Sequence, residues 1–115
     1  MAIAHQLIGE IAVVNLTGKL QGGTPDSQEM KEAIQKLLDT GVKNFVLDLA
    51  AVKRMHSSGL GVLISMLTSI RNRGGDLKLA AISETMEGIL AITKLNSIFE
   101  TFKTVTQATQ SFTKS

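Results

Sequence analysis

The sequence predicts a single α/β domain spanning residues 1–115, with a mixed sheet of four to five strands and about four helices. Its length suits one domain, and a hydrophobic content of 43% is enough to form a buried core. Two short β-favouring runs flank Gly9 and Glu10, which predicts an N-terminal antiparallel hairpin. After the hairpin, strand-like and helix-like runs alternate, and this order predicts parallel βαβ units.

The first elements are the two strands of the hairpin and a helix. The strands are expected at residues 2–8 and 11–17, and the GKLQGG segment that follows (residues 18–23) is expected to be a loop. Thr24 and Pro25 predict a helix start, because threonine can cap a helix and proline suits its first position. The apolar residues of this helix recur at helical spacing, and they are Met30, Ala33, Ile34, Leu37 and Leu38.

A strand and a longer helix follow in the middle of the chain. The strand is expected at residues 42–50, where successive side chains point to opposite faces, and Asp48 in mid-strand is interpreted as a hydrogen-bonding anchor for a loop. The helix is expected at about residues 58–73. Its core face is expected to hold Leu60, Leu63, Ile64, Leu67 and Ile70. The opposite, solvent-facing side is expected to hold Ser58, Val62, Ser65, Ser69 and, at its edge, Met66.

The last third of the chain predicts shorter elements. Residues 77–82 (LKLAAI) are expected to form a strand parallel to the preceding one. Ser83 can cap a third helix, whose first turn carries two glutamates in the position that the helix dipole favours. A short last strand is expected at residues 98–99, and a terminal helix at residues 104–112.

The composition argues against several functional classes. The chain has no cysteine, which removes disulfides, thiolate catalysis and zinc–thiolate sites. The two histidines, His5 and His56, are far apart in the sequence and do not indicate a metal site, and no convergent acid–base set indicates an enzyme. The net charge is only +2, and there is no Trp or Tyr, so nothing indicates a nucleic-acid-binding surface. We therefore expect no metal, no cofactor and no nucleic-acid partner.

The chain is also expected to stay out of membranes. No apolar run approaches the roughly 20 residues that a membrane-spanning helix needs. The N-terminal apolar run has no preceding Lys or Arg and contains Glu10, which is unlike a signal peptide. A cytoplasmic protein is therefore the expectation.

The RMHSSGLG stretch (residues 54–61) lies between the middle strand and the long helix, where α/β proteins place functional loops. A phosphate on Ser58 would be tolerated by the free N–H groups and the dipole of the helix start. Gly59 and Gly61 carry no side chain, so the backbone of another protein could approach closely. The residues alone leave a simpler interpretation open, in which the serines only cap the helix.

Several motifs of the chain resemble the STAS domain family, and the resemblance covers nearly the whole sequence. The motifs are GKL from Gly18, LDLAAV from Leu47 and SSGLG from Ser57, followed by a long helix that ends in RNRGG. The family includes bacterial anti-sigma factor antagonists and the cytoplasmic tails of anion transporters. The resemblance implies a bacterial regulator of transcription rather than an enzyme.

The resemblance also implies a partner and a set of contact residues. The partner would be an anti-sigma factor that is also a serine kinase of the histidine-kinase-like ATPase type. It would bind the unmodified protein and would end the complex by phosphorylating Ser58, with Ser57 as the second choice. The partner-binding residues would be Gln21, His56, Ser57, Ser58, Gly59, Gly61, Val62 and Met66. Some members of the family also bind nucleotides weakly.

Two positions depart from the family's pattern. His56 and Gln21 stand where the family usually has aspartate, so Ser58 is predicted to be phosphorylated poorly or not at all. Two alternatives therefore stay open: a STAS scaffold that is not phosphorylated, and a module that senses a small anion or a nucleotide. In the second alternative, the GKLQGG segment and the helix start would hold a phosphate beside Lys53 or Arg54.

Overall fold

The computed structural model describes residues 2–20, 25–55 and 57–113, with the backbone alone at residues 2, 18–20, 25–27, 53–55, 57–58 and 113. The elements in chain order are β1 (Ala2–Ile8), β2 (Ile11–Leu20), α1 (Pro25–Asp39), β3 (Asn44–Met55), α2 (Ser57–Asn72), β4 (Asp76–Ala80), α3 (Glu84–Ile92), the 3-10 helix η1 (Leu95–Ser97), β5 (Glu100–Phe102) and α4 (Val105–Thr113).

The five strands form one open, mixed sheet in the order β1-β2-β3-β4-β5. β1 pairs with β2 in antiparallel orientation, and β2, β3, β4 and β5 are parallel to one another. Gly9 and Glu10 make the turn of the hairpin, and Gly9 has a φ of +61°, which glycine adopts without steric cost. The α/β class, the N-terminal hairpin and the parallel βαβ units predicted from the sequence are confirmed.

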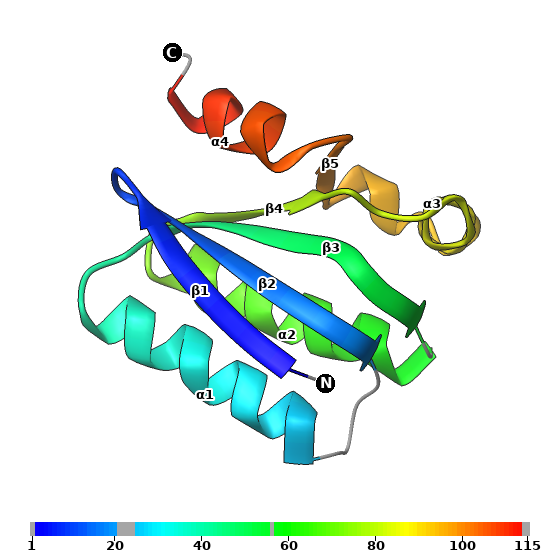
Figure 1. Ribbon diagram of the computed structural model, residues 1–115, viewed down its shortest axis with the longest axis horizontal. Helices are drawn as coiled ribbons and strands as arrows, with labels where there is room; N and C mark the ends of the chain where they lie inside the picture. Colours follow the sequence, from blue (N-terminus) through cyan, green and yellow to red (C-terminus); the bar gives the residue numbers. More distant parts are fainter. Residues whose placement is uncertain (1, 21–24, 56, 114–115) are drawn as a thin grey trace.

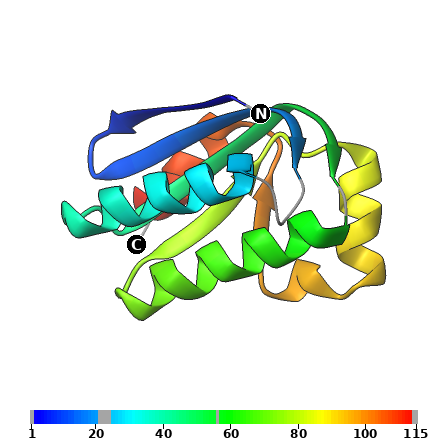
Figure 2. The same ribbon diagram turned by 90° about the horizontal axis from the view of Figure 1, so that it is seen from below.

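Helices cover the two faces of the sheet unequally, as Figure 1 and Figure 2 show. α1, α2 and α3 pack around the larger hydrophobic core, and α4 covers the other face, where it is the only described helix. The largest fully buried side chains of the larger core are Leu16, Met30, Ile34, Phe45, Leu47, Leu63, Met66, Ile70, Leu77, Leu79 and Leu90. The smaller core consists of Ile11, Val13, Val46, Ala80 and Ala108. The two cores exist because successive side chains of each strand point to opposite faces.

The helix starts and stops agree well with the local sequence signals. α1 begins at Pro25, and Gly41, with a φ of +100°, follows its end. At the start of α3, the Ser83 hydroxyl accepts a hydrogen bond from the N–H of Met86 (3.2 Å), as expected of an N-cap. The last strand was expected at residues 98–99, but β5 begins just after them.

Two strands are longer than the sequence predicted. Residues 18–20, expected in a loop, extend β2, and residues 51–55, left out of the predicted strand, extend β3. The two extensions pair with each other as far as Leu20 opposite Met55. Gly18 favours a loop and Lys53 and Arg54 are charged, but the hydrogen-bonding partner that each segment offers the other outweighs these local preferences.

Asp48 stabilises an irregularity in the ladder between β2 and β3. The register shifts just after the pair formed by Asn15 and Asp48, where β3 has an extra residue. The Asp48 carboxylate accepts a hydrogen bond from the backbone N–H of Ala50 (3.1 Å) and another from the side-chain amide of Asn15 (2.9 Å). Asp48 is therefore a hydrogen-bonding anchor, but its partners lie in the strands β2 and β3 rather than in the loop predicted from the sequence.

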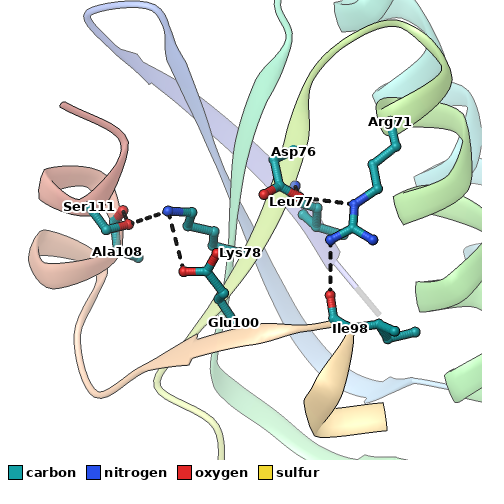
Figure 3. Close-up of polar contacts among 8 residues, drawn as sticks. All are labelled: Arg71, Asp76, Leu77, Lys78, Ile98, Glu100, Ala108 and Ser111. Atoms are coloured by element: carbon teal, nitrogen blue, oxygen red, sulfur yellow. Dashed lines mark hydrogen bonds and ion pairs between the residues drawn. The ribbon is translucent and has the colours of Figure 1, made fainter. Parts of the chain in front are cut away.

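Lys78 links α4 to the sheet (Figure 3). The residue is only 7% exposed, and its ammonium group donates a hydrogen bond to the Ser111 hydroxyl (2.7 Å) and lies 3.6 Å from the Glu100 carboxylate. The ammonium also lies 4.3 Å from the centre of the Phe112 ring, within the range of a cation–π interaction. These contacts compensate a charge that would be costly to bury alone, and they join β4, β5 and α4.

Two arginines tie the end of α2 to its surroundings. Arg73 donates a hydrogen bond to Asp39 at the end of α1 (2.8 Å), and this bond holds the pKa of the Asp39 carboxyl below its usual value. Arg71 donates to the Asp76 carboxylate (3.4 Å) and to the carbonyl of Ile98 (3.1 Å), as Figure 3 shows. These pairs are exposed, so they orient the elements more than they add stability.

Candidate functional site

The SSGLG motif lies where β3 ends and α2 begins. β3 ends at Met55 and α2 begins at Ser57, so the motif forms the first residues of the helix. Because β2 and β3 are parallel, their carboxyl ends lie at the same edge of the sheet, next to the start of α2 (Figure 1). Open α/β sheets commonly carry their binding sites at this edge.

The structure describes only part of the predicted site. Gln21 and His56 lie outside the described residues, and Ser57 and Ser58 are described by their backbone alone. Ser58 is the second residue of α2, in the first turn, where backbone N–H groups have no acceptor within the helix. These N–H groups and the positive end of the helix dipole favour a phosphate. That the Ser58 hydroxyl points outward stays a prediction.

The predicted division of α2 into a core face and a solvent face is wrong at three positions. Val62 and Met66 were expected in solvent but are 3% and 2% exposed, whereas Ile64 was expected in the core and is 36% exposed. The reason is α1, which packs beside α2 and covers one flank of it (Figure 2). Met66 and Ile34 of α1 line the same depression between the two helices. The buried stripe of α2 is therefore turned toward α1, and Val62 and Met66 are core residues.

The exposed face of α2 begins directly after the first turn. We name this surface the α2 outer face, and it consists of Gly61, Ile64, Ser65 and Thr68. These residues are spaced i, i+3, i+4 and i+7, so they lie on one side of the helix. Ile64 is their one large apolar side chain. The spacing is visible in the sequence, but the sequence does not show which flank a neighbouring helix covers.

The two glycines at the start of α2 differ in their surroundings. Gly59 is buried, so it is not open to contact with another protein. Gly61 is exposed, and a Cβ at this position would have no heavy atom of the described residues within 4 Å. Alanine would therefore fit at position 61 and would favour the helix by roughly 1 kcal/mol. The described fold does not require this glycine, which leaves room for the backbone of another protein to approach.

The α2 outer face suits contact with another protein, since small side chains surround one exposed isoleucine. Within residues 2–20, 25–55 and 57–113, no group of three or more His, Asp or Glu side chains is placed to hold a metal ion. In the same part of the chain, no helix has the length and apolar character that crossing a membrane requires.

The anion-sensing alternative depended on the GKLQGG segment. Its first three residues, 18–20, belong to β2 rather than to a loop, and residues 21–23 lie outside the described part of the chain. The side chains of Lys53 and Arg54 are likewise not described, although their backbone belongs to β3. This alternative stays a prediction.

Comparison with known proteins gives the family context of this site. The family model for the STAS domain matches residues 2–108. The anti-sigma F factor antagonist of Paenibacillus polymyxa is 30% identical over 90 residues, which cover 76% of this chain and 74% of that protein.

Solved structures have the same fold. The crystal structure of TM1081 from Thermotoga maritima has a TM-score of 0.87 and 22% identity, and the match covers 97% of this chain and 95% of that chain. The structure of the Bacillus cell fate determinant SpoIIAA in its phosphorylated form has a TM-score of 0.75 and 18% identity, over 96% of this chain and 99% of that chain.

Proposed function

Since the chain belongs to the STAS domain family, we propose that it is an anti-sigma factor antagonist, a regulatory protein that binds an anti-sigma factor and thereby frees a sigma factor. The name of the Paenibacillus polymyxa relative supports this role. The proposed docking surface is the first turn of α2 together with the α2 outer face.

The observation that carries the proposal is the position of the SSGLG motif. It begins α2 at the carboxyl edge of the parallel strands, and the exposed Gly61 and Ile64 follow it directly. A partner that lies across the helix start would meet the serine hydroxyls first, then an open glycine, and then an apolar side chain. The buried Val62 and Met66 take no part in this contact.

Ser58 is the proposed phosphorylation site, and the kinase is the anti-sigma factor itself, of the histidine-kinase-like ATPase type. A phosphate adds about −1.5 to −2 charges. The start of α2 tolerates these charges, so the fold persists while the docking surface becomes negative and repels the partner. The existence of a phosphorylated form of SpoIIAA supports this kind of switch.

We expect Ile64→Asp to weaken binding to the anti-sigma factor of the same organism about tenfold or more, because it places a charge in an apolar contact. Titration calorimetry with the purified anti-sigma factor measures the change. Ile92→Asp is the matched control, since Ile92 is 84% exposed and lies on α3, outside the α2 outer face. The control variant should bind like the unchanged chain. An equal loss in both variants would rule out the α2 outer face as the docking surface, and no binding by the unchanged chain would rule out the function.

The kinase is expected to phosphorylate the unchanged chain slowly, because His56 and Gln21 are neutral or weakly basic where the family usually has aspartate. Incubation with the kinase and ATP, followed by intact-mass measurement over time, gives the rate. His56→Asp restores one carboxylate and should raise that rate, whereas Ser58→Ala should abolish the modification. Rapid, complete phosphorylation of Ser58 in the unchanged chain would contradict this prediction.

A further inference from the structure

The N-terminal strand β1 leaves a long edge of the sheet open. It pairs with β2 on one side, and no strand within the described part of the chain pairs with its other side. An open edge presents unpaired backbone N–H and C=O groups, which can accept a further strand. The opposite edge is formed by β5 and has only three residues, so β1 is the edge at which the sheet could be extended.

β1 also lacks the features that usually protect an edge strand from pairing. Its sequence, AIAHQLI, contains no lysine, no acidic residue and no proline. All seven residues pair with β2 in continuous register, without a bulge. Leu7 and Ile8 are 57% and 44% exposed, although both side chains are large and apolar. A strand added at this edge would cover backbone groups and apolar side chains together.

We propose that a second copy of the chain adds its own β1 to this edge in antiparallel orientation, so that two five-stranded sheets join into one continuous sheet. The two-fold axis would pass beside His5, the central residue of the strand Ala2–Ile8. Two-fold dimers are the commonest homo-oligomers, and an antiparallel strand pair satisfies this symmetry when each strand pairs with itself.

The geometry of the hairpin determines which backbone N–H and C=O groups of β1 point away from β2 and can pair with an added strand. Ile8 flanks the two-residue turn opposite Ile11, so the backbone groups of Ile8 point toward β2. Backbone direction alternates along an antiparallel strand, and the groups of Leu7, His5 and Ile3 therefore point away from β2. Pairing about His5 then sets Leu7 of one copy opposite Ile3 of the second copy. Apolar side chains would meet on the same face of the joined sheet.

The charges beside β1 favour a second copy over an unrelated strand. α1 runs alongside β1 in the same direction (Figure 2), and a depression between them is lined by His5 and by α1 residues that include Glu29, Glu32 and Lys36. Both glutamates precede Lys36 along α1. A two-fold axis at His5 reverses this order in the second copy, so the glutamates of each copy would lie toward the lysine of the other.

Because the chain has no cysteine, single cysteine variants can test the pairing directly. In His5→Cys, the two cysteines would face each other across the axis at a Cα separation of about 5.5 Å, within the range of a disulfide. Mild oxidation should convert most of this variant to a linked dimer on a non-reducing gel. Gln6→Cys is the matched control, because position 6 is the next exposed residue of the strand. Its two copies would be more than about 7 Å apart, too far to form a disulfide.

Sedimentation equilibrium gives an independent test with the full chain. The unchanged chain should show a concentration-dependent dimer, and Leu7→Lys should raise the dimer dissociation constant about tenfold or more, because it places a charge opposite the apolar Ile3 of the second copy. Ile92→Lys, at an exposed position of α3, should leave the dimer unchanged, and circular dichroism should show that both variants are folded. The proposal is overturned if the unchanged chain is monomeric at every concentration, or if cysteines at positions 5 and 6 cross-link equally. If the chain is monomeric, the strand that pairs with β1 would have to come from another protein.

Discussion

Ser58→Asp is expected to lower the affinity for the anti-sigma factor by about 100-fold, which corresponds to ~2.7 kcal/mol. The substitution adds a negative charge in the first turn of α2, immediately before the α2 outer face. Within the domain this is a favourable place for a carboxylate, because the helix dipole is positive there. The fold should therefore persist, and the loss should arise in the contact with the partner. Titration calorimetry against the purified anti-sigma factor measures it.

Two further variants separate the effect of charge from the loss of the hydroxyl. Ser58→Ala should bind at least as tightly as the unchanged chain and should resist the kinase. Thr106→Asp is the matched control, because Thr106 is the exposed second residue of α4, on the other face of the sheet. It adds the same charge at the same helical position and should bind normally. Equal affinity of the two aspartate variants would contradict the proposed role of Ser58.

Gly75→Ala is expected to lower the free energy of unfolding by about 3 kcal/mol or more, as a severe case of overpacking. A Cβ at this position would lie 1.8 Å from the carbonyl oxygen of Lys43. No side-chain rotation can relieve this clash, because the obstructing atom belongs to the backbone. The same carbonyl accepts a hydrogen bond from the N–H of Asp76 (3.1 Å), where β3 and β4 begin to pair. The clash should therefore separate the two strands, and urea unfolding followed by circular dichroism measures the loss.

Gly88→Ala provides the matched comparison, since it makes the same chemical change without a clash. Gly88 lies within α3, and a Cβ there would have no heavy atom of the described residues within 4 Å. Alanine should raise the free energy of unfolding by about 0.5–1 kcal/mol, because glycine is unfavourable in a helix. If both variants lost the same stability, the contact with Lys43 would not be the cause.

Much of the fold could be predicted because its signals are local. The Gly9-Glu10 turn, the Pro25 helix start and the Ser83 cap each act on the residues next to them, and the structure has a turn or a helix start at each. The SSGLG motif could also be placed correctly at the junction of a strand and a helix, although all five residues belong to the helix. Prediction of the site was poorer along α2, where Val62 and Met66 are buried and Ile64 is exposed.

The amino-acid order is sufficient to specify a hairpin followed by βαβ units, because hydrophobic periodicity and turn-forming residues act within a few positions of the chain. The position of α1 against α2, and hence which residues of α2 meet solvent, depends on packing between segments that are far apart in the sequence. The extension of β2 and β3 past their predicted ends has the same origin, since the backbone of each strand supplies the hydrogen-bonding partners of the other. The exposed Ile64 and the open edge of β1 therefore became visible only once the helices and strands were placed in space.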